Sequence, residues 1–179
     1  MTVPFGGASV LVTGGQGFVG AHLCERLLAA GARVVVPRRD VHPRSRFRLE
    51  GIEERCDLVA CDLAAVESVQ RVLAEEEIEY VFHLAAQTIV GTARRAPLST
   101  FESNVRATYV LLEACRSVPD RLRAIVVASS DKAYGPSDEL PYKEDTPLRP
   151  TFPYDVSKAC ADLIARSYAL TYELPVAVT

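Results

Sequence analysis

Apolar residues follow two different spacings along this chain. Short runs rich in Val, Ile and Leu alternate with longer stretches in which apolar residues recur every three or four positions. The short runs are typical of strands buried on both faces, and the longer spacing is typical of amphipathic helices. The runs predict six strands, at residues 9–13, 33–36, 58–60, 80–84, 124–128 and 176–179.

The longer spacing predicts a helix in most of the intervals between these strands. In the first interval, Val19, Leu23, Leu27 and Ala30 share one helical face, and Gly31 ends the helix. Three more helices are expected at residues 64–76, 101–115 and 154–172. Strands that alternate with helices form a parallel sheet covered on both faces. The sequence therefore predicts an α/β fold with a doubly wound parallel sheet, in the strand order 3-2-1-4-5-6.

The composition narrows the class of protein. Of 179 residues, 49% are hydrophobic, which is enough to bury a sizeable core and excludes an intrinsically disordered chain. The 20 Lys and Arg nearly balance the 23 Asp and Glu, so a nucleic-acid-binding surface is not expected. There is neither an apolar run of membrane-spanning length nor a start typical of a signal peptide, and we expect a cytoplasmic protein that does not enter a membrane.

Cysteine and lysine usage add two observations. The five cysteines are scattered and form no Cys-x-x-Cys pair, which argues against a disulfide framework and against a zinc site. Of the 20 basic residues, 17 are arginine and only Lys132, Lys143 and Lys158 are lysine. An ammonium can lose its proton and a guanidinium practically cannot, so a lysine in such a chain is a candidate for proton transfer.

A glycine-rich segment follows the first strand and opens the first helix. Glycines at positions 14, 17 and 20 permit a tight turn, a close approach of backbone N–H groups to a pyrophosphate, and packing of helix on strand. A plain turn is the alternative, but the flanking strand and amphipathic helix supply the context that a dinucleotide site requires. We therefore predict that NAD or NADP binds Gly14, Gln16, Gly17, Phe18, Val19 and Gly20.

The position that would read the cofactor's ribose holds no acidic residue. A carboxylate directly after the second strand would bind the 2′-hydroxyl of NAD, but Pro37 stands there, followed by Arg38, Arg39 and Asp40. The two arginines suit the 2′-phosphate of NADP or are surface charges, so the choice between NAD and NADP stays open. Beyond the third strand, Asp62, followed by Leu63, is expected near the adenine amino group, as a helix N-cap, or in both roles.

Two polar clusters are candidates for the reactive groups. Tyr154 and Lys158 are four residues apart, hence one turn apart on one helical face, where an ammonium favours the phenolate form of a tyrosine. The second cluster, residues 129–135, directly follows the fifth strand, and reactive groups in open α/β sheets gather at the carboxyl ends of strands. The alternatives are a chance pair on an amphipathic helix and a polar loop.

Six segments together resemble the extended short-chain dehydrogenases/reductases, in matching order and over essentially the whole chain. Within that superfamily, Asp131 and Lys132 after the serine are similar to the nucleotide-sugar 4,6-dehydratases, closest to the CDP-glucose type. Relatives acting on dTDP-glucose or GDP-mannose carry a glutamate in place of Lys132. The segments are TGGQGFVG at 13–20, CDL at 61–63, FHLAAQ at 82–87, NV at 104–105, SSDKAYG at 129–135 and YDVSK at 154–158.

The resemblance implies a role for each matching residue. Tyr154 would be the catalytic base, and Lys158 its electrostatic partner and a ribose contact. Ser130 would hydrogen-bond the reacting sugar oxygen, while Asp131 and Lys132 would transfer protons. Asn104 would be structural. Apart from the resemblance, we expect His83 to be a buried or cofactor-side structural residue rather than a catalytic one, and Arg94 and Arg95 to be surface residues rather than contacts of a sugar nucleotide. The cofactor would also be lined by Leu84, Ala85, Ala86 and Gln87.

These expectations define a function and its alternatives. We expect an enzyme that converts a nucleotide-hexose to its 4-keto-6-deoxy product by transient oxidation at C4 with bound NAD or NADP. The alternatives are a nucleotide-sugar 4-epimerase and a non-catalytic dinucleotide-binding module. Residues 1–179 would form one Rossmann domain, with the substrate domain absent or truncated and little activity of this portion alone. A homodimer is expected to pair the helices at residues 101–116 and 154–172.

Overall fold

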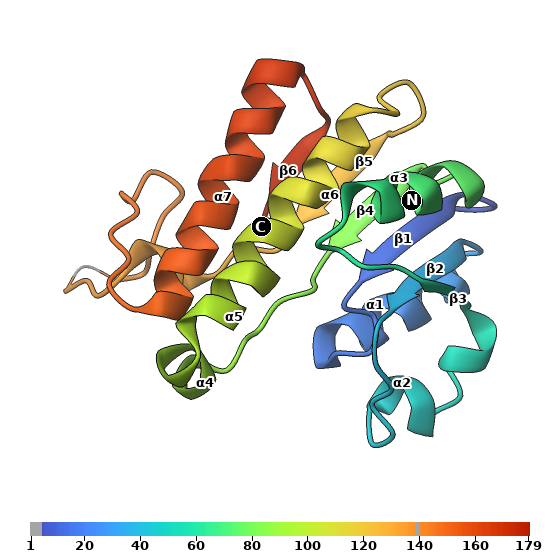
Figure 1. Ribbon diagram of the computed structural model, residues 1–179, viewed down its shortest axis with the longest axis horizontal. Coiled ribbons are helices and arrows are strands. Elements are labelled where there is room, and N and C mark those ends of the chain that lie inside the picture. Colours follow the sequence, from blue (N-terminus) through green and yellow to red (C-terminus); the bar gives the residue numbers. More distant parts are fainter. Residues whose placement is uncertain (1–4, 139) are drawn as a thin grey trace.

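A single six-stranded parallel sheet organises the chain in the computed structural model, which describes residues 5–138 and 140–179. The strand order is β3-β2-β1-β4-β5-β6, which confirms the predicted doubly wound topology (Figure 1). The strands are β1 (Ser9–Thr13), β2 (Arg33–Arg38), β3 (Asp57–Ala60), β4 (Tyr80–His83), β5 (Ala124–Val127) and β6 (Val176–Val178).

Alternate residues of the strands enter two separate cores. Val10, Val12 and Val34 of β1 and β2 pack on one face of the sheet, beneath α1 (Phe18–Ala29) and α2 (Arg46–Leu49). Leu11 and Val35 point to the other face, beneath α3 (Val66–Glu75), α6 (Ala107–Arg116) and α7 (Pro153–Tyr172). Since successive strand side chains point to opposite faces, a strand buried on both faces must be apolar throughout. This is why the strands appear in the sequence as continuous Val-rich runs.

The predicted helix at residues 101–115 is divided in three. It consists of α5 (Pro97–Phe101), a π-turn (Glu102–Arg106) and α6, and it is preceded by a short helix that the sequence did not reveal, α4 (Val90–Arg95). A π-turn fits one extra residue into a helix and is frequent at functional sites. Here it sets the direction from which Asn104 approaches the ends of the strands.

All the strands are parallel, so the carboxyl ends of β1, β2, β3, β4 and β5 lie together at the same end of the sheet. The glycine-rich segment, the segment after β2, residues 61–63 and residues 84–88 follow these ends directly. Figure 1 shows α6 and α7 side by side, with the irregular segment before α7 projecting from the same end as α4. Within residues 5–138 and 140–179, no helix has the length and apolar character that crossing a membrane requires.

Candidate functional site

A cavity of about 1150 Å³ lies at the carboxyl ends of the strands. It brings together segments that are far apart in the sequence, and nearly every residue predicted to contact a dinucleotide lines it. Arg38 is the exception, and the pair Tyr154 and Lys158 lies outside the lining. The predicted residues that line it are Gly14, Gln16, Gly17, Phe18, Val19, Gly20, Arg39, Asp62, Leu63, Leu84, Ala85, Ala86 and Gln87.

The glycine loop is shaped by two close backbone approaches. Gly14 has φ +75°, and a Cβ there would lie 2.8 Å from the backbone nitrogen of Ala85. A Cβ at Gly20 would overlap the carbonyl oxygen of Gly14. At Gly17 the backbone is ordinary, with φ −73°, and a Cβ would lie 3.2 Å from that same oxygen. Gly14 and Gly20 are therefore required for the backbone of the loop to form. A side chain at Gly17 would meet only the Gly14 carbonyl, and Gly17 lines the cavity.

Three buried oxygens around the site have no partner in the described residues. They are Gln87 Oε1 and Ser45 Oγ, whose residues line the cavity, and Ser129 Oγ directly after β5. Buried polar atoms are nearly always hydrogen-bonded, so the two unpaired oxygens of residues that line the cavity, on Ser45 and Gln87, indicate a polar ligand. The glycine loop supplies backbone N–H groups at the start of α1, where an anion is favoured. The residues present therefore fit a dinucleotide.

The two arginines after β2 point in different directions. Arg39 lines the cavity and pairs with Asp40 at 2.8 Å. Arg38 instead donates to Glu53 at 3.2 Å and does not line the cavity. Gln16 of the glycine loop holds the segment between them and α2, because its amide donates to Asp40 O at 2.9 Å and accepts from the backbone N–H of His42 at 3.2 Å. Sequence reasoning placed Gln16 at the cofactor but missed this bridge, which joins positions 24 and 26 residues apart.

Asp62 lines the cavity but does not cap a helix. Its Oδ1 accepts the backbone N–H of Ala64 at 2.9 Å, and its own N–H donates to Ser68 Oγ at 3.0 Å. Because α3 begins only at Val66, with Ala65 at the N-cap position, the alternative of an Asp62 N-cap is wrong. The carboxylate closes a local turn that presents residues 62 and 63 to the cavity.

A buried chain of side chains connects β1 with the π-turn. Thr13 Oγ1 accepts the backbone N–H groups of Leu84 and Ala85, both at 3.2 Å, so its own O–H donates to His83 Nδ1 at 2.8 Å. His83 therefore carries its proton on Nε2 and donates it to Thr108 Oγ1 at 3.1 Å. Burial, followed by the nearby charge of Lys158, lowers the pKa of His83 to about 3. His83 is thus a neutral buried residue, in keeping with the structural role expected of it.

Asn104 holds the loop after β4 against α7. Its Oδ1 accepts the backbone N–H of Gln87 at 2.7 Å, and its Nδ2 donates to Gln87 O at 3.0 Å and to Ser157 Oγ at 2.9 Å. Ser157 in turn donates to the carbonyl of Tyr154 at 2.7 Å. The sequence indicated a structural Asn104 but not its partners, because the three segments that meet here are separated by 17 and 53 residues.

The candidate reactive groups lie beside the cavity, on α7 and on a 3₁₀ turn (Asp131–Tyr134) that packs against it. Tyr154 and Lys158 are buried in the first turns of α7, and Lys158 Nζ donates to the carbonyl of Ala128 at the end of β5. Burial lowers the pKa of Lys158 below its usual range. The chain thus places an ammonium in a dry environment next to the start of the 3₁₀ turn.

Ser130, Asp131 and Lys132 form the start of that turn. Ser130 Oγ accepts the backbone N–H of Lys132 at 3.2 Å, and Lys132 Nζ lies 3.6 Å from Asp131 Oδ2. Both charged side chains are more than half exposed. Asp131 and Lys132 therefore form an exposed ion pair at the start of the 3₁₀ turn.

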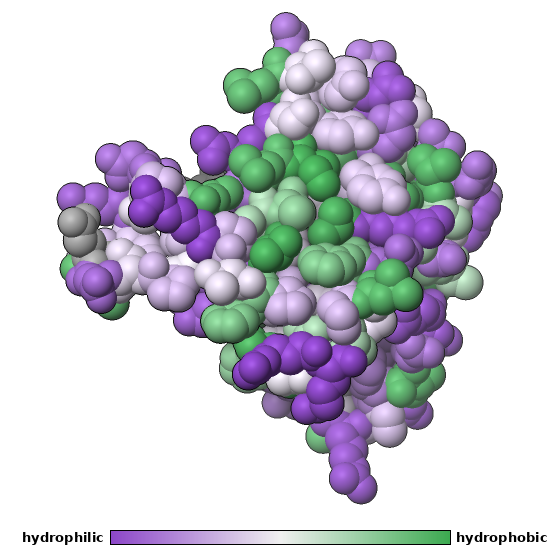
Figure 2. Space-filling model, turned by 60° about the vertical axis from the view of Figure 1, so that its left-hand side comes forward, coloured by the Kyte–Doolittle hydropathy of each residue, from purple (hydrophilic) through white to green (hydrophobic). Residues whose placement is uncertain are grey.

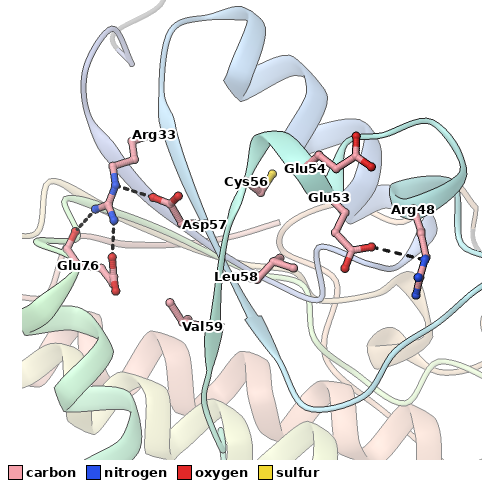
Figure 3. A pocket seen from close by; sticks show the side chains of 9 residues that line it. All are labelled: Arg33, Arg48, Glu53, Glu54, Cys56, Asp57, Leu58, Val59 and Glu76. Atoms are coloured by element: carbon pink, nitrogen blue, oxygen red, sulfur yellow. Dashed lines mark hydrogen bonds and ion pairs between the residues drawn. The ribbon is translucent and has the colours of Figure 1, made fainter.

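A second, open cavity of about 680 Å³ lies along β3, at the outer edge of the sheet (Figure 3). Most of its charged side chains are paired: Arg33 pairs with Asp57 at 2.7 Å and with Glu76, and Arg48 lies 3.9 Å from Glu53. Glu53 is also the partner of Arg38, which explains why that arginine turns away from the first cavity. Because both arginines of the lining are already paired with carboxylates, this second cavity offers an anionic ligand little.

The comparison with protein families gives one match over most of the chain. The profile of the GDP-mannose 4,6 dehydratase family matches residues 11–179. Among characterised proteins, a UDP-glucose 4-epimerase of Bacillus subtilis is 36% identical over 162 residues, which cover 88% of this chain and 47% of that protein. A trifunctional UDP-glucose 4,6-dehydratase of Arabidopsis thaliana is 32% identical over 178 residues, covering 96% of this chain and 27% of that protein.

Solved structures agree with the sequence comparisons. The dTDP-glucose 4,6-dehydratase of Streptomyces venezuelae with NAD bound has a TM-score of 0.85 and 31% identity, over 95% of this chain and 54% of that one. The UDP-glucose 4-epimerase of Brucella ovis in complex with NAD has a TM-score of 0.84 and 28% identity, over 96% of this chain and 50% of that one. The chain thus spans about half the length of these structures. Dehydratases and epimerases both occur among the relatives, so the comparisons do not distinguish the two activities.

Proposed function

Because the chain belongs to the NAD-dependent epimerase/dehydratase family of extended short-chain dehydrogenases/reductases, we propose that it is the cofactor-binding portion of a nucleotide-sugar 4,6-dehydratase. The acid and base pair of Asp131 and Lys132, 3.6 Å apart directly after Ser130, is the observation that carries the proposal. Loss of water from the sugar requires the C5 proton to be removed and the departing C6 hydroxyl to be protonated, whereas epimerisation at C4 requires neither of these two steps.

The cavity at the carboxyl ends of the strands supports a place for the dinucleotide. The glycine loop would bind its pyrophosphate, and Gln87 would use its unpaired Oε1 on a polar group of the cofactor. A bound NAD or NADP would supply the hydride chemistry, which is oxidation at sugar C4 and later reduction at C6. The remaining steps are proton transfers, which the chain's own side chains must perform.

Tyr154 is proposed as the base that removes the proton from the C4 hydroxyl. Asn104 and Ser157 fix the first turn of α7 through the carbonyl of Tyr154, so the position of the phenol is set by the π-turn. Lys158, held by the carbonyl of Ala128, would supply a positive charge one helical turn from Tyr154. Ser130 would donate a hydrogen bond to the same sugar oxygen.

Lys132 and Asp131 are proposed to complete the dehydration. The C4 ketone makes the C5 proton acidic. Lys132, in its neutral form, would remove that proton and become an ammonium, and Asp131, in its protonated form, would protonate the departing C6 hydroxyl and become a carboxylate, so both roles require the substrate-bound site to favour the neutral forms of this pair. Both side chains are exposed in this half of the protein, so the substrate and the rest of the enzyme would have to cover them. Because Lys132 replaces the glutamate of the dTDP-glucose and GDP-mannose enzymes in the resemblance, we propose CDP-glucose as the first substrate to test.

A 4-epimerase is the second candidate, and the Bacillus subtilis epimerase at 36% identity supports it. The full-length enzyme incubated with CDP-glucose, GDP-mannose, dTDP-glucose and UDP-sugars distinguishes the two by the mass of the product. A product lighter by one water establishes the dehydratase. A product of unchanged mass with inverted C4 establishes the epimerase instead, and an absence of any turnover by enzyme that binds the cofactor would favour a non-catalytic module.

A further inference from the structure

Two cysteines that are far apart in the sequence meet behind the glycine loop. Cys24 lies on α1 and is completely buried, whereas Cys56 stands directly before β3 and is half-buried. Both side chains contribute to the core beneath α1, and their thiols are hydrogen-bonded to each other. The two sulfur atoms are therefore neighbours, as the formation of a disulfide requires.

The two thiols differ in reactivity. The hydrogen bond from Cys24, assisted by the charge of Arg55, lowers the pKa of Cys56 despite its partial burial. The same hydrogen bond, together with burial, raises the pKa of Cys24. Cys56 also lines the open second cavity along β3, where Figure 3 shows its side chain. A cysteine that is partly exposed and has a lowered pKa is the reactive kind, and a buried neighbouring cysteine is placed to react second.

Cys24 also supports the glycine loop from behind. A Cβ added at Gly15 would lie 3.3 Å from Cys24 Sγ and 2.8 Å from Val36 Cγ1, so the loop backbone packs on these two side chains. Gly15 itself lines the first cavity. Cys24 thus connects the two cavities, because its sulfur contacts Cys56 of the second and packs against the loop of the first.

We propose that Cys24 and Cys56 are a redox-sensitive pair: a peroxide that enters the second cavity oxidises them to a disulfide, which weakens dinucleotide binding at the glycine loop. The effect on binding rests on the proposed function, whereas formation of the disulfide does not. Where thiols are kept reduced, disulfides are usually transient and serve redox sensing or catalysis. A reversible pair is therefore compatible with a chain whose scattered cysteines form no disulfide framework.

The oxidation takes place in two steps. The Cys56 thiolate attacks one oxygen of hydrogen peroxide, the O–O bond breaks, and the departing hydroxide takes up the thiol proton and leaves as water. Cys56 is then a sulfenic acid. Cys24 Sγ attacks the Cys56 sulfur, the S–S bond forms, the S–O bond breaks, and the hydroxide leaves as a second water with the proton of Cys24. Two thiols lose two electrons and one peroxide is reduced to two waters.

The disulfide acts on the loop through the position of Cys24. Hydrogen-bonded sulfur atoms must close to ~2.0 Å to form the bond, so Cys24 Sγ moves toward Cys56 and away from Gly15. The backbone of the glycine loop then loses part of its support. Because interiors are close-packed, such a displacement is transmitted to the neighbouring backbone.

Peptide mapping of the purified protein tests the pair directly. After treatment with hydrogen peroxide and alkylation of the remaining thiols, cleavage before aspartate separates Cys56 from Cys61, because Asp57 lies between them. We expect the fragment that contains Cys24 to be joined to the fragment that ends at Cys56, with a mass lower by two hydrogen atoms, and dithiothreitol to release both. Oxidation of Cys61 or Cys160 without this crosslink would overturn the proposal.

Calorimetric titration with NAD and NADP tests the effect on the loop. We expect oxidised protein to bind the preferred dinucleotide at least about threefold more weakly, and dithiothreitol to restore the affinity. Peroxide should leave the affinity of Cys56→Ser unchanged. Cys160→Ser is the matched control, because Cys160 is half-buried like Cys56 but lies on α7, and this variant should respond as the wild type does.

Two results of the titration would contradict different parts of the inference. Crosslinked protein with the affinity of the reduced form would show that the disulfide does not act on the glycine loop. Binding of neither dinucleotide by reduced, folded protein would contradict the proposed function and the effect on binding, while the peptide map would still decide whether Cys24 and Cys56 form the pair.

Discussion

The side-chain nitrogen of Asn104 lies 2.9 Å from the hydroxyl of Ser157, which ties the π-turn to the helix that carries Tyr154. The same amide holds both the N–H and the carbonyl of Gln87. Asn104, the only asparagine in the chain, therefore connects the cavity lining with the candidate base. A side chain must accept at one atom and donate twice at the other to do this, and only an amide of this length fits.

Asn104→Asp keeps the size of the side chain but removes both donors and buries a carboxylate against two oxygens. We expect the free energy of unfolding to fall by ~3 kcal/mol or more, measured by urea denaturation. Dinucleotide affinity should fall as well, because Gln87 is released. Arg106→Gln on the same π-turn removes only an exposed ion pair with Glu102 and should cost less than ~0.5 kcal/mol. Equal effects of the two variants would show that Asn104 does not hold these segments.

His83 should make the free energy of unfolding decrease as the pH falls below ~6.5. Its pKa is lowered to about 3 in the folded chain, while an unfolded histidine titrates near pH ~6.5. Below that pH the unfolded chain binds a proton that the folded chain does not, so the stabilising contribution is complete above pH ~6.5 and is lost as the pH falls toward 3. The free energy of unfolding is expected to fall by at most ~1.4 kcal/mol for each pH unit.

Urea denaturation at pH 7, 6 and 5 measures this dependence. His83→Gln should be less stable at pH 7, because the bonds to Thr13 and Thr108 are altered, but its stability should decline less steeply toward pH 5. His22→Gln, at an exposed position of α1, should follow the wild-type profile. Parallel profiles for wild type and His83→Gln would mean that His83 binds its proton over the same pH range in the folded and the unfolded protein.

The sequence predicted the sheet better than it predicted the site. Strands buried on both faces must be apolar at every position, so their runs are visible in the sequence with an error of one or two residues at the ends. The π-turn leaves no such trace, because one extra residue hardly alters the three-to-four spacing of apolar residues. Arg38 and Arg39 look equivalent in the sequence, and only Glu53, fifteen residues away, turns the first of them outward.

The glycine loop gives a prediction that separates binding from folding. Gly20→Ala would drive a Cβ into the Gly14 carbonyl, so we expect a loss of stability of ~2 kcal/mol or more in thermal or urea unfolding. Gly17→Val has an allowed backbone conformation and should fold, but its side chain would occupy the place of the phosphate. Titration should therefore show at least a tenfold weaker dinucleotide affinity with near-normal unfolding. Normal affinity in folded Gly17→Val protein would place the pyrophosphate elsewhere.

Lys132 decides between the two enzymatic candidates. In a dehydratase, Lys132→Ala should lower kcat by about 10²-fold to 10⁴-fold, the usual effect of removing a general base. Lys132→Arg should not restore activity, because a guanidinium keeps the charge but cannot accept a proton. Lys143→Ala, at the exposed loop lysine, is the control and should be silent. In an epimerase both Lys132 variants would retain nearly full activity.

The last prediction concerns the surface of α7, which we propose as half of a homodimer interface. Leu163 and Leu170 are 56% and 84% exposed and lie seven residues apart, hence on one face of the helix. Figure 2 shows hydrophobic side chains gathered in the middle of the face on which the α7 side of the molecule comes forward. On α6, which packs beside α7, Tyr109 is also 42% exposed. Pairing these two helices with those of a second copy would bury the leucines.

Replacing both leucines by glutamate should convert the dimer to a monomer. Each substitution removes a buried leucine side chain, which costs the dimer ~1.5 to 3 kcal/mol of association free energy, and adds a charge to the interface. Sedimentation or light scattering of the full-length protein would show the mass halved. Leu49→Glu, at a leucine 72% exposed on α2 beyond the opposite face of the sheet, adds the same charge elsewhere and should leave the mass unchanged. The proposed interface would be wrong if the wild-type protein were a monomer or if the protein with both α7 substitutions were still a dimer. The exposed face of α7 would then contact another partner.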